Sequence, residues 1–215
     1  MTPEREEKFR RVVAKRQFNL TVVLENVHDP HNIGAVMRSC DAVGIREIYV
    51  LYTEDKLTEE TLQVGRSAAS GAKKWVEVHL YEDAATCFTA IRQKYDHIFA
   101  THLAEDAKSL YDIDLTASVA LLFGNEKDGV SEASLAFTDG NFLIPQMGMV
   151  QSLNISVACA VSLYEALRQR QQAGLYDHDP VALNAQQIEL FQRYYNLHEQ
   201  RIIDRRNSKK GLELD

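Results

Sequence analysis

The sequence predicts an α/β domain in which a mainly parallel β-sheet is flanked by helices. The first observation is a set of short, apolar, β-branched runs, LTVVL at 20–24, EIYVL at 47–51 and VALLF at 119–123, which are typical of buried strands. The second observation is that segments with helical periodicity lie between these runs. Strands that alternate with helices favour a parallel sheet that is covered on both faces.

The other elements continue this alternation along the chain. Further strands are expected at 75–80, 95–101 and 142–144. Helices are expected at 3–16, 33–43, 83–94, 131–137, 154–172 and 186–205, with helical turns near 59–64 and 66–70 and a frayed tail from 207. Asn32 and Ser131 are suitable N-caps because a short polar side chain accepts the free N–H groups of a first helical turn. Arg168 and Arg170 lie where positive charge suits the carboxyl end of a long helix.

The chain has 215 residues, of which 45% are hydrophobic and 26% charged, so we expect one medium globular domain with extensions. The expected parts are an N-terminal helical extension at 1–17, a main domain at 18–173, and a linker, helix and tail at 174–215. No apolar run approaches the length of a membrane span, and the charged N-terminus is unlike a secretory signal. We therefore expect a cytoplasmic protein without a membrane partner.

The three cysteines, Cys40, Cys87 and Cys159, lie far apart in the chain. They form no CxxC pair, and none lies near a histidine at the spacing of a metal site. Two of them fall within apolar helical patterns, so buried and reduced thiols are expected. The sequence therefore predicts neither a metal site nor a catalytic cysteine.

The formal net charge is −7 and the pI is about 5.5, which does not by itself indicate a nucleic-acid binder. Basic residues nevertheless gather at both ends of the chain, namely Arg5, Lys8, Arg10, Arg11, Lys15 and Arg16 at one end and Arg201, Arg205, Arg206, Lys209 and Lys210 at the other. Two interpretations stay open. The ends form a surface that contacts RNA, or they form two solvated amphipathic helices.

Three polar loops follow apolar strands, and the first is HDPHNIGAVMRSCDAVG at 28–44. It carries Asn32 and Arg38. An arginine within an apolar helical pattern needs an anionic partner, because burying an unpaired guanidinium is costly. A phosphate fits the geometry of arginine, and an internal ion pair to Asp41 is the alternative.

The second loop, LFGNEKDGVS at 122–131, has glycines that permit close approach of a ligand to the backbone, and Glu126 as a hydrogen-bond acceptor. It contains neither GxGxxG nor a Walker motif, and a solvated surface turn is the alternative. The third loop spans 145–151 and joins a strand to a helix, as ligand-binding loops of α/β proteins do. Ser152 and Asn154 follow it, and helix capping is the alternative role of their side chains.

Taken together, HNIGAVMRSCDAVG (31–44), LLFGNEKDGVS (121–131) and IPQMGMVQSLNISVACAVSLYEAL (144–167) resemble the three motifs of the SPOUT superfamily of RNA methyltransferases. The resemblance is specifically to the TrmH branch, the tRNA and rRNA ribose 2′-O-methyltransferases, and it covers roughly residues 18–172. It implies a deep trefoil knot in the C-terminal part of the domain, S-adenosylmethionine as methyl donor, and a homodimer. Spacing and periodicity alone do not predict a knot.

The resemblance also implies roles for particular residues. Arg38 matches the arginine that prepares the ribose 2′-OH with help from an RNA phosphate, and Asn32 matches the asparagine that supports it. Glu126 and Asn154 match the polar residues that shape the pocket. The residues implied in binding the donor are Thr101, Leu103, Gly124, Ile144 and Leu153, with Met149 and Ser152 close by.

Within this branch the chain is most similar to enzymes that methylate guanosine 18 of tRNA, since it has short basic extensions and no separate N-terminal RNA-binding domain. The implied function is therefore methyl transfer to a tRNA ribose, with tRNA as partner. Methylation of rRNA or of the tRNA wobble nucleotide is one alternative. A non-catalytic RNA-binding knot protein is another.

Overall fold

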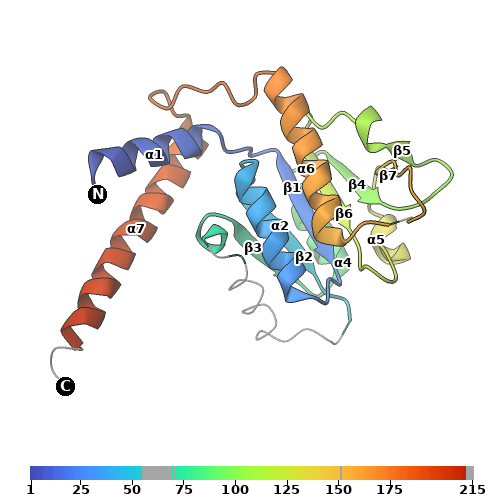
Figure 1. Ribbon diagram of the computed structural model, residues 1–215, viewed down its shortest axis with the longest axis horizontal. Coiled ribbons are helices and arrows are strands. Elements are labelled where there is room, and N and C mark those ends of the chain that lie inside the picture. The colour runs from blue at the N-terminus through green and yellow to red at the C-terminus, as the bar shows by residue number, and fades with distance from the viewer. Residues whose placement is uncertain (55–68, 70, 151, 212–215) are drawn as a thin grey trace. The chain divides into compact units, whose positions relative to one another are not determined.

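The computed structural model describes residues 1–54, 69, 71–150 and 152–211, with the side chains of 205–211 left out of the description (Figure 1). The chain divides into two compact units. One contains Gln17–Gly174, and the other combines Met1–Arg16 with Leu175–Asp215. Among the described helices, none has the length and apolar character needed to cross a membrane.

The larger unit is built on a seven-stranded sheet with the order β3-β2-β1-β6-β4-β7-β5 (Figure 1). The strands are β1 (Leu20–Glu25), β2 (Glu47–Leu51), β3 (Glu77–Tyr81), β4 (His97–Thr101), β5 (Lys108–Ser109), β6 (Val119–Phe123) and β7 (Gly140–Leu143). Every pair of neighbouring strands is parallel, which confirms the predicted parallel sheet.

Several strands differ from the prediction, and β3 and β4 begin at Glu77 and His97 rather than at 75 and 95. The prediction omitted β5, because a two-residue edge strand is too short to show any periodicity. The last strand, β7, begins at Gly140 rather than 142, because Gly140 and Asn141 pair in register with Phe99 and Ala100 of β4. Glycine and asparagine carry no strand signal in the sequence, so only the pairing reveals this start.

Helices cover both faces of the sheet (Figure 1). They are α2 (Pro30–Ala42), α4 (Ala84–Arg92), α5 (Glu132–Leu135) and α6 (Ile155–Gln172), with short 3₁₀ turns at Ala72–Lys74 and Leu110–Asp112. The smaller unit contains α1 (Pro3–Ala14) and α7 (Ala185–Gly211). Side chains of α2 and α6 share one hydrophobic core with the sheet, and side chains of α4 and α5 pack in a second core. The sheet is therefore the middle of three layers.

Several helix boundaries correct the prediction. The helix α2 begins at Pro30 with Asp29 as its N-cap, and Asn32 is not the cap. Proline suits the first helical position, and the Asp29 carboxylate accepts the His31 N–H at 2.8 Å. The helix α7 continues to Gly211, through the start of the expected tail. The turns expected at 59–64 and 66–70 fall outside the described residues, apart from Ala69.

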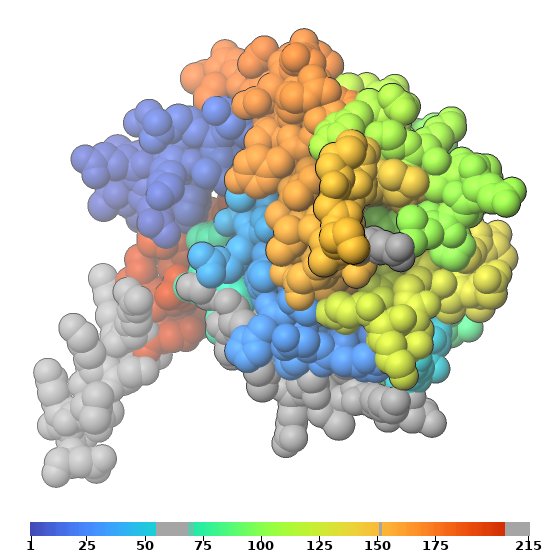
Figure 2. Space-filling view, turned by 45° about the vertical axis from the view of Figure 1, so that its right-hand side comes forward, coloured from blue at the N-terminus to red at the C-terminus, as the bar shows by residue number. Residues whose placement is uncertain are grey.

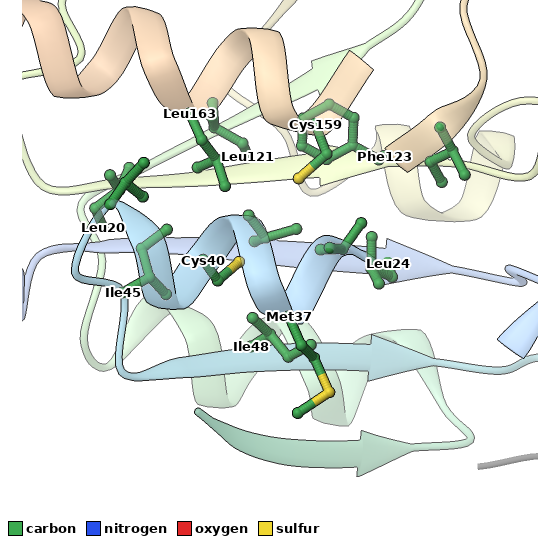
Figure 3. Close-up of a cluster of buried hydrophobic side chains, with 14 of the residues drawn as sticks. Leu20, Leu24, Met37, Cys40, Ile45, Ile48, Leu121, Phe123, Cys159 and Leu163 are labelled. Carbon is green, nitrogen blue, oxygen red and sulfur yellow. The ribbon is translucent and has the colours of Figure 1, made fainter. Parts of the chain in front are cut away.

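The larger core lies where α2 and α6 meet β1, β2 and β6 (Figure 3). Met37 and Cys40 of α2 and Cys159 and Leu163 of α6 are fully buried there. All three cysteines are buried and form no disulfide, as expected. Burial also raises the pKa of the Cys87 thiol to about 12, so this side chain stays protonated and unreactive at neutral pH.

Arg170 lies in the last turn of α6, as predicted, and its side chain is completely buried. Its guanidinium donates to the backbone carbonyls of Leu115 at 2.8 Å and Ala117 at 2.7 Å. It also donates to the side chains of Gln17 at 2.9 Å and Asn19 at 2.7 Å. Arg170 therefore ties α6 to the segments that precede β1 and β6.

The smaller unit joins the two ends of the chain. The ring of Phe9 in α1 packs edge-on against Tyr194 and His198 of α7, with centroid distances of 6.1 and 5.8 Å. The Gln187 amide donates to the Ala14 carbonyl at 3.2 Å. The two terminal extensions, which the sequence presents separately, thus pack against each other.

Candidate functional site

A pocket of about 480 Å³ opens at the carboxyl ends of β4, β6 and β7. It is lined by Thr101, His102, Leu103, Phe123, Gly124, Asn125, Glu126, Lys127, Asp128, Gly129, Phe142, Leu143, Ile144, Gln146, Ser152, Leu153, Ile155 and Ala158. Figure 2 shows a hollow between the green segment 101–109, the yellow-green segment 124–130 and the gold segment 144–150. The carboxyl ends of parallel strands are the usual location of ligands in open α/β sheets.

Six of the seven residues predicted to bind the donor line this pocket, namely Thr101, Leu103, Gly124, Ile144, Ser152 and Leu153. The seventh, Met149, does not line it, and 98% of its side chain is exposed. The prediction placed Met149 near the pocket because it lies in the same loop. The backbone of this loop instead turns the side chain outward, which sequence spacing does not determine.

The loop from Gly124 to Gly129 closes on itself. Asn125 and Gly129 exchange two backbone hydrogen bonds of 3.0 and 2.9 Å. Gly124 lies so close to the facing chain that an added Cβ would come within 2.2 Å of the Gly129 carbonyl carbon and oxygen. Gly129 itself has a φ of +73°, which an L side chain rarely adopts. Both glycines are therefore required for this wall of the pocket.

Sequence reasoning missed Asn125, which holds the loop in shape. Its side-chain oxygen accepts the backbone N–H groups of Lys127 at 2.7 Å and Asp128 at 3.2 Å. Its side-chain nitrogen donates to the carbonyl of Asn26 at 2.9 Å. An asparagine between a glycine and a charged turn was the available signal, because asparagine commonly bonds to the backbone two residues further on.

Asn32 and Glu126 meet at the edge of the pocket. The side-chain amide of Asn32 donates to the Glu126 carboxylate at 2.5 Å, and Asn32 is 9% exposed. Burial, and then the negative charge of Glu126, raise the pKa of the nearby Tyr52 hydroxyl. The structure thus brings the predicted residues of the first and second motifs together.

Arg38 does not need an internal partner, contrary to the expectation from the apolar helix pattern. Its side chain is exposed on α2, and within the described part of the chain it forms no hydrogen bond or ion pair, with Asp41 or any other residue. Ala35 and Ala42 share its exposed face and are too short to shield it. Arg38 does not line the pocket and is open to a partner from outside.

Asn154 is also absent from the pocket lining, and its side chain is exposed. Its oxygen caps α6 by accepting the Ser156 N–H at 2.9 Å and the Ser156 hydroxyl at 2.6 Å. The capping alternative that the sequence left open therefore describes the contacts of Asn154. Ser152, the other candidate cap, lines the pocket instead.

Gln146 has a polar atom without a partner in the described part of the chain. Its side-chain oxygen is buried, and no hydrogen-bond donor reaches it from the described residues. Gln146 lines the pocket, although this oxygen itself is not exposed to it. Leaving a buried acceptor unpaired costs about 1–3 kcal/mol.

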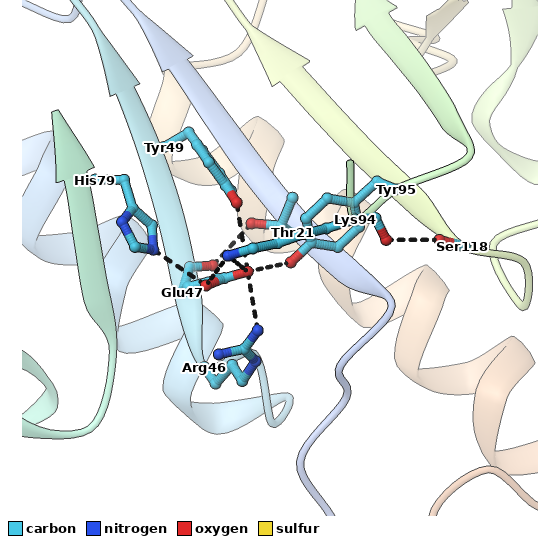
Figure 4. A network of polar contacts seen from close by, with 8 residues as sticks. All are labelled: Thr21, Arg46, Glu47, Tyr49, His79, Lys94, Tyr95 and Ser118. Atoms are coloured by element: carbon cyan, nitrogen blue, oxygen red, sulfur yellow. Dashed lines mark hydrogen bonds and ion pairs between the residues drawn. The ribbon is translucent and has the colours of Figure 1, made fainter. Parts of the chain in front are cut away.

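A second polar cluster lies around Glu47, at the start of β2 and therefore at the amino ends of the strands, opposite the pocket (Figure 4). The buried Glu47 carboxylate lies 3.1 Å from Arg46, His79 and Lys94 and accepts the Tyr95 hydroxyl at 2.9 Å. Burial raises the pKa of Glu47, but hydrogen bonds and positive charge outweigh burial and lower it to about 2.

Glu47, Glu77 and His79 place three potential metal ligands within 4.8 Å of one another. The charges of Arg46 and Lys94 already neutralise Glu47, so a divalent cation would be repelled from this position. The cluster is better explained as an ion network that joins β2, β3 and the end of α4.

The basic N-terminus is partly neutralised within its own helix. Arg10 pairs with Glu6 at 3.1 Å and Arg11 with Glu7 at 3.8 Å. The guanidinium of Arg5 lies 5.1 Å from the ring centroid of Phe9. The positive charge available to a partner is therefore smaller than the residue count implies. At the other end, the side chains of Arg205, Arg206, Lys209 and Lys210 lie outside the description.

Comparisons with known proteins point to one group of relatives. A model of the SpoU rRNA Methylase family matches residues 19–164. The tRNA (guanosine(18)-2′-O)-methyltransferase of Thermus thermophilus is 44% identical over 176 residues, which are 82% of this chain and 88% of that protein. The crystal structure of the A. aeolicus TrmH/SpoU tRNA modifying enzyme aligns with a TM-score of 0.73 and 33% identity, over 90% of this chain and 96% of that one. The SpoU methyltransferase AviRb from Streptomyces viridochromogenes, in complex with the cofactor AdoMet, aligns with a TM-score of 0.65 and 26% identity, over 73% and 62% of the two chains.

Proposed function

Since this chain belongs to the SpoU rRNA Methylase family, we propose that it transfers a methyl group from S-adenosylmethionine to a ribose 2′-OH of tRNA, at guanosine 18. The observation that carries the proposal is the pocket, whose walls come from three segments at the carboxyl ends of β4, β6 and β7. The similarity to the Thermus enzyme over most of both chains supports tRNA as the substrate.

The pocket residues fit the methyl donor. S-adenosylmethionine supplies an electrophilic methyl group and carries amino groups that need hydrogen-bond acceptors. The side chain of Gln146, which lines the pocket and whose oxygen has no partner among the described residues, is a candidate for this role. Phe123, Phe142 and Ile144 supply apolar surface for the rest of the molecule. Positioning of the donor against the ribose accounts for much of the acceleration of a displacement reaction.

Arg38 is the residue that we assign to the ribose. Its exposed guanidinium has no partner among the described residues, so it is free to bind an RNA phosphate next to the reacting hydroxyl. Arginine stays protonated, and the phosphate is therefore the better acceptor for the proton of the 2′-OH. Asn32 and Glu126 fix each other at the pocket edge, and Asn154 supports the site by holding the first turn of α6.

One experiment tests this function against its alternatives. Purified protein is incubated with S-adenosylmethionine labelled in the methyl group and a tRNA mixture, and the modified nucleotide is mapped. The proposal expects 2′-O-methylguanosine at position 18, and no product with Arg38→Ala. Methylation of rRNA, or of the tRNA wobble nucleotide, would show that the reaction is the proposed one but the substrate is different. No transfer and no donor binding by calorimetry would indicate a non-catalytic RNA-binding protein.

A homodimer is part of the proposal. Met147, Met149 and Val150 of the pocket loop expose 95%, 98% and 66% of their surface, and Val157 and Tyr164 are exposed on α6. An exposed apolar surface of this kind is typical of an interface between subunits. Light scattering should give twice the chain mass of 24.4 kDa, and Tyr164→Glu should shift the protein toward the monomer.

The trefoil knot and a cytoplasmic location are also proposed. The knot is proposed from membership of the SpoU rRNA Methylase family, because a strand order of this kind occurs with or without threading. Mechanical unfolding from both ends would leave a shortened, tightened contour if the chain is knotted. Fractionation of cells should recover the protein with the cytoplasmic tRNA-modifying enzymes.

A further inference from the structure

Glu25 is a fully buried carboxylate at the last position of β1, and it does not line the pocket. One of its oxygens accepts the backbone N–H of Ser131 at 3.0 Å. The other accepts the hydroxyls of Ser131 and Ser134, each at 2.6 Å. Three donors from the start of α5 thus converge on one carboxylate, at the end of the loop that begins with Gly124.

The beginning of this loop is attached to Asn26, the residue that follows Glu25. Asn26 has a left-handed backbone with a φ of 51°, and its carbonyl accepts the Asn125 side chain at 2.9 Å. Two hydrogen bonds of 3.0 Å between Asn26 and Thr53 hold this conformation in place. Asparagine tolerates a left-handed backbone better than most residues, and here it directs the carbonyl toward the loop.

The segment between these attachments is held in shape by its own internal hydrogen bonds. Asn125 and Gly129 close it through their backbones, and Asn125 also binds two of its N–H groups. Besides the contact between Asn32 and Glu126, two attachments fix its placement over the pocket, Asn125 on Asn26 and α5 on Glu25. This segment carries Glu126 to its contact with Asn32.

We infer that Glu25 is a positioning residue for the methyl donor, acting through Ser131 and Ser134 to hold the 124–129 wall of the pocket at the distance that the donor requires. This inference rests on the proposed function for the identity of the ligand. Glu25 touches neither donor nor RNA and makes no contact with Arg38, so its removal should weaken donor binding and leave tRNA binding unchanged. A displacement of about 1 Å at a binding wall is enough for a large loss.

The first test measures ligand binding by Glu25→Ala with the full chain. Isothermal calorimetry with S-adenosylmethionine should give a dissociation constant raised tenfold or more, with one site still bound per folded chain. The KM for the donor should rise more than kcat falls, and tRNA binding should stay within twofold. A merely structural role would instead lower the fraction of active protein and leave the dissociation constant unchanged, and that result would overturn the inference.

Two further variants keep the test decisive if Glu25→Ala folds poorly. Ser134→Ala removes one donor to Glu25 and should weaken donor binding in the same direction but less. Glu25→Gln keeps the shape and one acceptor for the Ser131 N–H, while the serine hydroxyls can accept from its amide, so it should restore part of the affinity. Glu132→Gln, at an exposed position of α5, is the matched control and should bind the donor normally.

Hydrogen exchange separates this inference from the proposed function. Without any ligand, the amides of 124–131 should exchange faster in Glu25→Ala than in the unmodified chain, while those of β6 remain protected. If the unmodified chain binds no S-adenosylmethionine, the proposed function fails, and the exchange result still decides whether Glu25 positions the loop. Unchanged exchange in 124–131 would contradict the inference whatever the ligand.

Discussion

The side-chain amide of Asn32 donates a hydrogen bond to the Glu126 carboxylate, across 94 residues of sequence. Asn32 lies in the first turn of α2, and Glu126 lies in the loop after β6. Because β1 and β6 are neighbours in the sheet, the segments after them meet at one edge. This contact joins the first two polar loops and holds an exposed carboxylate at the mouth of the pocket.

Removing either partner of this contact should lower methyl transfer. A hydrogen bond to a charged group contributes about 1.5–3 kcal/mol, so Asn32→Ala and Glu126→Ala should each lower kcat/KM by about tenfold to 100-fold. The double variant should be little worse than either single variant, because both remove the same interaction. Steady-state kinetics on tRNA measures all three, with Glu132→Gln as control. Fully additive losses would mean that the two residues act separately.

Arg38→Ala should abolish activity without affecting stability. The exposed side chain has no partner among the described residues, so its loss removes no native contact. The rate should fall by about 100-fold or more, as expected for a group that assists proton transfer. The melting temperature should stay within about 2 °C of the unmodified chain. Arg38→Lys should restore little activity, because an ammonium cannot bind a phosphate in the bidentate geometry.

Gly124→Ala should disrupt the pocket. Its Cβ would lie 2.2 Å from the backbone of Gly129, so the facing strand would have to shift. Forcing extra atoms into such a contact costs about 1–3 kcal/mol, and donor binding should weaken by more than tenfold. Calorimetry and thermal melting provide the two readouts. Gly148→Ala is the matched control, because nothing lies within 4 Å of an added Cβ there, and normal melting of both variants would contradict the prediction.

Arg170→Met should destabilise the larger unit. It would leave the carbonyls of Leu115 and Ala117 buried without a donor, at a cost of about 3 kcal/mol or more. Chemical denaturation should show this loss directly. Arg168→Met, in which a 54% exposed side chain loses its ion pair with Glu165, should cost less than Arg170→Met. Equal losses in the two variants would show that burial of Arg170 is not important for stability.

The Glu47 cluster should make the fold sensitive to acid. The pKa of Glu47 is about 2 in the folded chain, against an ordinary value of 4.5, so the unfolded chain takes up the proton first. The stabilisation is therefore complete above pH 4.5 and is lost as pH falls toward 2, by about 3 kcal/mol in total. Denaturation midpoints measured across this range should fall in the unmodified chain, and Glu47→Gln should reduce that slope.

The parallel sheet was predictable because its buried strands need apolar, β-branched runs on both faces, and these runs are visible in the sequence. The boundaries of helices and strands were less predictable. Asp29 replaced Asn32 as the N-cap because Pro30 suits the first helical position, and both residues had acceptable side chains. The short strand β5 forms by pairing with β7, so no local sequence pattern predicts it.

The three loops at the strand ends were identified from their motifs, and most of the residues assigned to the donor line the same pocket. Contacts within the site were not predictable. Neither the partner of Asn32 nor the exposure of Arg38 can be derived from helix periodicity, because periodicity gives a face of a helix and not what covers that face. The outward orientation of Met149 likewise depends on the backbone of its loop.

The sequence by itself determined the α/β class, the order of the strands along the chain and the three polar segments, because hydrophobic period and turn chemistry are local properties. Only the tertiary structure decided which of those segments meet. The sheet order places β6 between β1 and β4, and this brings Glu126 to Asn32 and the start of α5 to Glu25. It also buried Arg170, since the acceptors that satisfy its charge come from segments more than 50 residues away.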